Sequence, residues 1–135
     1  SVWSTVIPEG STAGTYYVWY KVVGGTNYNS ADPACITVTI AKADQTVPVG
    51  IGKTDETICK KADGVITGVT AAMEYRKDNE DTYTDVNGNV VANLAAGKYY
   101  VRIKGDGNHN PSAEILITIA AGRRLLFLHS RSDIR

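Results

Sequence analysis

Nine residues decide the fold of this chain: Ala96-Gly97-Lys98-Tyr99-Tyr100-Val101-Arg102-Ile103-Lys104. Nearly the same sequence occurs earlier in the chain, as Ala13-Gly14-Thr15-Tyr16-Tyr17-Val18-Trp19-Tyr20-Lys21. In both copies a small, glycine-containing turn precedes a run in which every second residue is large and apolar. That period of two is typical of a β-strand with one buried face. The sequence therefore predicts a β-module that occurs twice.

The two copies stay in step beyond these strands. The offset between them is 83 residues at Ala13 and Ala96, 81 at Asn27 and Asn108, and 79 at the last strand residues. A unit of about 80 residues is the size of a small independent β domain and is longer than a solenoid repeat. We expect a truncated C-terminal part of one module over residues 1–43, a complete module over 44–122, and a tail over 123–135 that matches nothing earlier.

The alternation also predicts which side chains face inward. The expected core residues are Tyr16, Val18 and Tyr20 in the first copy and Tyr99, Val101 and Ile103 in the second. The outward aromatic residues are candidates for contact with a ligand or partner, because flat rings stack on sugar faces and anchor protein contacts. These candidates are Tyr17, Trp19 and Tyr100. The favoured alternative is that they cover a neighbouring module or a sheet edge. Arg102 in the place of Trp19 indicates that this face does not keep one chemistry in the two copies.

Short β-like runs alternate with Asp, Asn and Gly turns throughout the second module, and no helix longer than a turn is predicted. About seven strands are expected, at Glu56–Lys60, Gly64–Val69, Met73–Arg76, Tyr83–Asp85, Val90–Leu94, Lys98–Lys104 and Glu114–Ile119. Asn87-Gly88 is expected to form a tight hairpin turn, because both residues tolerate a positive φ.

The first module is expected to be truncated, without most of its front sheet. About 12 residues precede its repeated strand, where the second module has about 50. A two-stranded piece is rarely stable alone, so residues 1–43 are expected to dock on the second module or on a neighbouring molecule.

Composition excludes several classes of partner. Lys and Arg together number 14, as do Asp and Glu, so the balanced charge argues against binding to nucleic acid or anionic lipid. The apolar fraction of 43% and the clustering of Tyr, Thr and Val indicate a folded β protein. No apolar run approaches the roughly 20 residues that span a bilayer, so no membrane insertion is expected.

Neither copy carries a chemical motif. The only histidines are His109, which replaces Tyr28 of the first copy, and His129 in the tail, so a base beside a nucleophile is not indicated. Cys35 and Cys59 are expected to be free thiols, with a bridge between them as the alternative. The oxygen-rich segment 85–89 is interpreted as a turn and less readily as a calcium loop. We expect no enzyme activity, no cofactor and no metal site.

Residues 4–121 resemble the immunoglobulin-like (Ig-like) tandem repeats of bacterial surface proteins, mostly of Gram-positive type. The segments that carry the resemblance are AGTYYVWYKVVGGTNYNSADPACITVTIAKA in the first copy and MEYRKDNEDTYTDVNGNVVANLAAGKYYVRIKGDGNHN in the second. The same phrase is similar to fibronectin type III domains, but there the tyrosine follows the leucine by six residues, and here Tyr99 follows Leu94 by five.

The resemblance implies an all-β chain with an Ig-like β-sandwich, outside the cell, on a bacterial surface or secreted. It implies a structural spacer or an adhesive module, with neighbouring repeats as partners and a cell-surface glycan or host protein as the alternative ligand. Tyr99 and Tyr16 would each send a hydroxyl to a nearby backbone group, as a tyrosine corner does. For residues 123–135 the leading interpretation is an added or read-through tail, ahead of a short strand and a basic membrane-contact segment.

Overall fold

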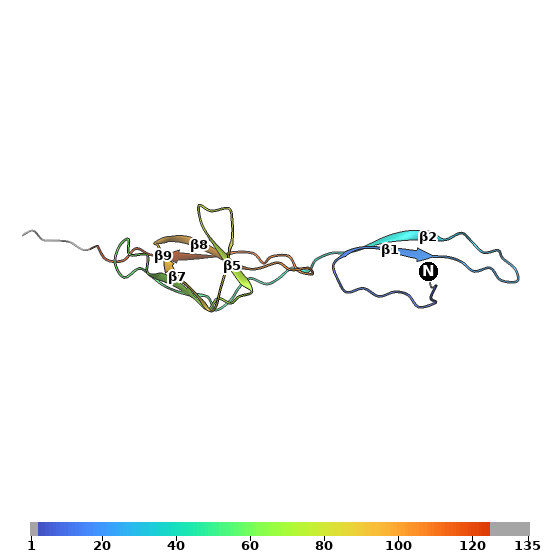
Figure 1. Cartoon of the computed structure of the whole chain (residues 1–135), viewed down its shortest axis with the longest axis horizontal. Helices are drawn as coiled ribbons and strands as arrows, with labels where there is room; N and C mark the ends of the chain where they lie inside the picture. Colours follow the sequence, from blue (N-terminus) through green and yellow to red (C-terminus); the bar gives the residue numbers. More distant parts are fainter. Residues whose placement is uncertain (1–2, 125–135) are drawn as a thin grey trace, which may run out of the picture. The chain divides into compact units, whose positions relative to one another are not determined.

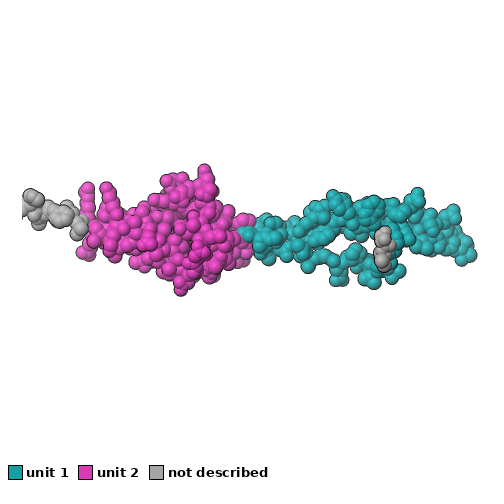
Figure 2. All heavy atoms as spheres, viewed as in Figure 1, with its two compact units in different colours: residues 1–44, 105–110 teal, residues 45–104, 111–135 magenta. Residues whose placement is uncertain are grey.

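The computed structural model describes residues 3–124, and within this range all regular structure is antiparallel β-strand, without a helix. The chain divides into two compact units (Figures 1 and 2). Unit 1 is Ser1–Asp44 with Gly105–Asn110, and unit 2 is Gln45–Lys104 with Pro111–Arg135.

Unit 1 is built on one antiparallel hairpin of β1 (Gly14–Tyr20) and β2 (Ala34–Ile40). The pairing is regular from Gly14 opposite Ile40 to Tyr20 opposite Ala34. Because side chains alternate across a strand, Val18 and its partner Ile36 lie on one face of this hairpin.

The expected core of the first copy is not buried, which corrects the sequence-based assignment of Tyr16, Val18 and Tyr20. Tyr16 is 37% exposed and Tyr20 is 51% exposed, while Val18 is half-buried. The physical reason is that a two-stranded sheet buries a face only when a second layer covers it. Within the described part of unit 1 no second sheet is present.

Unit 2 contains two antiparallel sheets. The first has three strands in the order β3 (Gly52–Thr54), β4 (Gly64–Thr67) and β7 (Val90–Leu94). The second has four strands in the spatial order β6 (Thr84–Asp85), β5 (Met73–Lys77), β8 (Gly97–Ile103) and β9 (Ile115–Ile119).

Both sheets contribute to a single hydrophobic core. The three-stranded sheet supplies Ile66, Val91 and Leu94, and the four-stranded sheet supplies Met73, Tyr99, Val101 and Ile119. Val101 and Ile66 are fully buried, and Ile103 is half-buried against the same cluster. Two antiparallel sheets that share a core in this way are compatible with a β-sandwich.

The sheets approach closely at Gly64. A Cβ atom at this position would lie 2.5 Å from Cγ2 of Ile119 on the opposite sheet and 2.8 Å from the carbonyl oxygen of Leu94. Glycine is therefore required here by space rather than by its φ angle.

The segment from Glu56 to Lys60 is a loop and not the strand expected from the sequence, and the edge strand lies earlier, at β3. Glu56 is 5% exposed, and its carboxylate accepts hydrogen bonds from the backbone N–H groups of Lys60 (3.3 Å) and Ala62 (3.0 Å). Both of these residues have positive φ angles, 67° and 53°. A buried carboxylate thus fixes a loop whose backbone is left-handed at two non-glycine positions.

The prediction of a hairpin turn at Asn87-Gly88 is wrong. The strand before it, β6, pairs with β5, and the strand after it, β7, pairs with β4, so these two residues lie where the chain crosses from one sheet to the other. Gly88 has a φ of 110°, which explains the glycine without a hairpin.

The loop Gly105–Asn110 belongs to unit 1, although the repeat places it in the second copy. The N–H of Ala43 donates to the carbonyl oxygen of Asn108 and the N–H of Asn110 donates to that of Ala43, both at 2.8 Å. The tail predicted over residues 123–135 begins inside unit 2. There the carbonyl oxygen of Arg123 accepts a hydrogen bond from the N–H of Cys59 at 3.1 Å. Residues 125–135 lie outside the described range.

We expect Tyr99→Ala to lower the free energy of unfolding of unit 2 by about 3–5 kcal/mol. The ring is 4% exposed and its hydroxyl donates to the carbonyl oxygen of Ala95 at 2.9 Å, so the change leaves a cavity and an unpaired acceptor. Urea unfolding measures the loss. The matched control is Tyr17→Ala, where the ring is 68% exposed and little change is expected. Equal effects of the two variants would contradict the burial of Tyr99.

We expect the carboxyl group of Asp63 to titrate far below an ordinary aspartate. It accepts hydrogen bonds from the hydroxyl of Thr57 (2.5 Å) and from its N–H (2.9 Å), which lower the pKa of Asp63 to about 2. Because the folded-state pKa is lower than the unfolded value of about 3.9, this group stabilises the fold above pH 4 and the contribution disappears as the pH falls to about 2. Carboxyl NMR titration measures the midpoint, which Thr57→Ala should raise. A midpoint near 4 in the parent chain would refute the expectation.

Candidate binding surface

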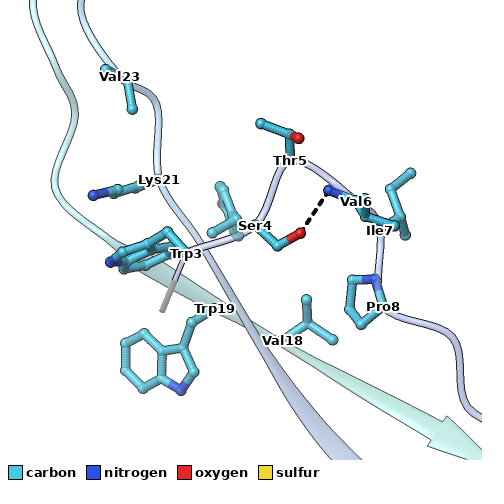
Figure 3. Close-up of a pocket in the computed structure, with 11 residues that line it drawn as sticks. Trp3, Ser4, Thr5, Val6, Ile7, Pro8, Val18, Trp19, Lys21 and Val23 are labelled. Carbon is cyan, nitrogen blue, oxygen red and sulfur yellow. Dashed lines mark hydrogen bonds between the residues drawn. The ribbon is translucent and has the colours of Figure 1, made fainter. Parts of the chain in front are cut away.

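The candidate site lies in unit 1, where the N-terminal segment passes beside the hairpin (Figure 3). The segment and the strands enclose two hollows, of about 480 and 270 Å³. Ile7, Pro8 and Val18 line both of them. The smaller hollow continues over the apolar face of the hairpin, past Tyr16 and Val38.

The larger hollow carries two indole rings and a cation. Trp3 is 42% exposed and Trp19 is 62% exposed, and the Nζ atom of Lys21 lies 4.6 Å from the centroid of the Trp3 ring. The segment is folded back locally by a hydrogen bond from the N–H of Val6 to Oγ of Ser4, 3.0 Å long (Figure 3). Flat aromatic surfaces beside a cation can stack on a sugar or receive an apolar side chain.

The three predicted contact residues belong to different units. Tyr17 and Trp19 lie in unit 1 and are exposed, but only Trp19 lines the hollow. Tyr100 lies in unit 2 and is half-buried. The guanidinium carbon of Arg76 is 4.4 Å from the centroid of the Tyr100 ring. A hydrogen bond to Asp78 raises the pKa of the Tyr100 hydroxyl, because it favours the protonated form. Tyr100 is thus occupied by partners within its own unit.

The face of unit 2 that corresponds to Trp19 is a network of paired side chains. Arg102 stands in the place of Trp19, with its guanidinium carbon 3.6 Å from the centroid of the Tyr83 ring and its Nε 2.7 Å from a carboxylate oxygen of Glu74. Arg76 pairs with Glu114 at 3.0 Å. The two copies therefore share their strands but not the chemistry of their outer faces.

Sequence reasoning missed the contribution of residues 3–10, which carry no period. Trp3 in particular has no counterpart in a strand pattern, and its place beside Lys21 depends on how the segment folds back. The available signal was the apolar run Val6-Ile7-Pro8, which is unusual for an exposed leader to a strand.

The remaining candidates for chemistry have simpler surroundings. His109 Nδ1 pairs with the carboxylate of Asp106 at 2.9 Å within one loop, and this contact lowers the pKa of Asp106. Cys35 and Cys59 are free thiols, the first exposed and the second half-buried. Between residues 3 and 124, no group of three or more His, Cys, Asp or Glu side chains is placed to hold a metal ion.

The described range also holds no helix that is long and apolar enough to cross a membrane.

Comparison of the chain with family models, with curated proteins and with solved structures finds no match.

Proposed function

We propose that the chain contains one complete Ig-like module and the closing hairpin of another, and that it serves as a non-catalytic spacer of a bacterial surface or secreted protein. The single observation that carries the proposal is that two segments about 80 residues apart fold into the same hairpin. Its partners are then neighbouring modules of the same kind.

The equivalence extends to the register of the strands. Gly14 faces Ile40 in unit 1 and Gly97 faces Ile119 in unit 2. Counting inward from these pairs, Val18 faces Ile36 just as Val101 faces Ile115. Since a slip of one residue would turn every side chain to the other face, an identical register means that the same positions point to the same face.

The connecting loops and the corner hydrogen bonds agree as well. Tyr16 donates its hydroxyl to the carbonyl oxygen of Thr12 at 2.7 Å, four residues back, as Tyr99 does to Ala95. In the loops, the N–H of Gly25 donates to the carbonyl oxygen of Tyr28, and that of Asp106 donates to the carbonyl oxygen of His109, both at 3.0 Å. These hydrogen bonds are local and do not require the two copies to be covered in the same way.

The segment that follows β2, residues 41–44, is the linker, and its hydrogen bonds support a spacer role. Beyond the two backbone bonds at Ala43, Nζ of Lys42 donates to the carbonyl oxygen of Asp106 at 2.6 Å, and the side-chain amide of Asn110 donates to Asp44 at 2.8 Å. The segment that leaves the first hairpin is therefore paired along its length. A paired linker resists extension better than a free one because its hydrogen bonds must break first.

A second function is favoured by the exposed indoles. Trp3 and Trp19 beside Lys21 form a surface suited to stacking on a glycan or anchoring a host protein. In this alternative the chain is an adhesion module, and the hollow in unit 1 is its binding site.

A glycan array with the parent chain and Trp19→Ala separates the two functions. The spacer proposal expects no reproducible signal from either protein. A sugar signal that falls at least about tenfold in Trp19→Ala would favour adhesion instead, because loss of an aromatic hot-spot residue costs about 2 kcal/mol or more and a tenfold change is about 1.4 kcal/mol. Tyr100→Ala is the matched control, since Tyr100 lies in the other unit beneath Arg76.

We further expect Asn110→Ala to speed amide exchange at Ala43 by about three- to tenfold, because the change removes the side-chain bond to Asp44. Hydrogen exchange followed by NMR measures the rate, and Asn79→Ala in an exposed loop of unit 2 is the control. An unchanged rate at Ala43 would argue against a linker held by this loop.

A further inference from the structure

We propose that the apolar face of the β1–β2 hairpin is a docking site for a pair of antiparallel β-strands of the β3–β4 type, supplied by another module. This inference rests on the repeat proposed above and adds to it the identity of the partner.

Unit 2 shows what covers this face. Tyr99, Val101 and Ile119 are 4%, 0% and 1% exposed because the three-stranded sheet lies against them. The central contributor is Ile66 of β4, which is 0% exposed. The corresponding residues of unit 1 are Tyr16, Val18 and Ile40. They have the same register, but the described residues of unit 1 contain no second sheet to cover them.

The face left open in unit 1 is apolar along both strands. Ile36 is 54% exposed and Val38 is 43% exposed, whereas their counterparts Ile115 and Ile117 are packed against the core of unit 2. Exposed aliphatic side chains in adjacent register positions mark an interaction surface rather than a solvated one.

The N-terminal segment supplies one edge of the missing layer. With the offset of 83 residues, Ile7 and Pro8 correspond to Val90 and Val91, the first residues of β7. In unit 2 this strand pairs with β4, with Val91 opposite Ile66. In unit 1 Ile7 and Pro8 line the hollow of about 270 Å³ together with Tyr16, Ile36 and Val38.

The hollow therefore lies where an Ile66-like side chain would sit, between a β7-like segment and the hairpin. Its occupant must present an apolar residue on an extended strand and a small residue where the layers approach, as β4 does with Ile66 and Gly64. The chain's own β3 and β4 already fill this role in unit 2, so the partner strands come from another module of the same kind.

The test is to add strands of the β3–β4 type to the chain at the spacing that they have in the second module. With the offset of 83, a second copy of residues 44–83 joined directly ahead of Ser1 gives the first module the same spacing as the second. We expect amide exchange at Tyr16 and Val18 to slow at least about 100-fold relative to the parent chain, because the hairpin would then open only with the whole module. The control is the same extended chain with Ile66→Asp in the added copy alone, in which exchange should stay fast.

Exchange at Tyr99 and Val101, measured in the same samples, shows whether unit 2 is a folded module. If these amides are unprotected, the proposed function fails. If they are protected while Tyr16 and Val18 exchange at the parental rate in the extended chain, only the docking inference fails. It also fails if the parent chain is already protected at Val18 and sediments as a dimer, which would make a second copy of the hairpin the occupant.

A second measurement covers the case in which the extended chain does not fold. A synthetic peptide of residues 49–69 is titrated onto the parent chain, and amide chemical shifts at Val18 and Val38 are followed by NMR. Saturable shifts that the Ile66→Asp peptide does not produce support the inference. The absence of shifts with both peptides at millimolar concentration overturns it.

Discussion

A β-hairpin with one apolar face is stable only when a second layer removes that face from water. The same hairpin occurs twice in this chain, once with such a layer and once without it. In unit 2, β8 and β9 lie against the three-stranded sheet, and Tyr99 and Val101 are buried. In unit 1, β1 and β2 have the same register and leave Tyr16 and Tyr20 exposed. The contrast shows that the register is set within the hairpin itself, whereas burial of its apolar face depends on the layer that covers it.

Local pattern was sufficient to locate the strands. The alternation around Tyr99 and Tyr16 predicted β8 and β1, because a period of two has no other common structural meaning. Burial of Tyr16 and Tyr20 could not be predicted in the same way, since it depends on a partner layer that no local pattern encodes. The Glu56 loop was missed for a related reason, because a carboxylate that accepts from backbone amides four and six residues ahead leaves no periodic trace.

The candidate site shows the same division. Trp19 was predicted to point outward and is exposed, whereas Trp3 was not identified because its position depends on the return of a segment without a period. The replacement of Trp19 by Arg102 was visible in the sequence. Its consequence was not, since the cation of Arg102 lies over Tyr83, a contact that the strand pattern does not encode. Side-chain networks of this kind arise from contacts across strands.

The assignment of Gly105–Asn110 to unit 1 bears on how such a protein can be divided for study. A cut between residues 43 and 44 follows the boundary predicted from the repeat. It would nevertheless deprive Asn108 and Asn110 of the Ala43 backbone with which they form hydrogen bonds. A fragment that starts a few residues earlier, at Lys42, would retain those bonds. In this chain a fragment that contains the second module should therefore start upstream of the module boundary predicted from the repeat.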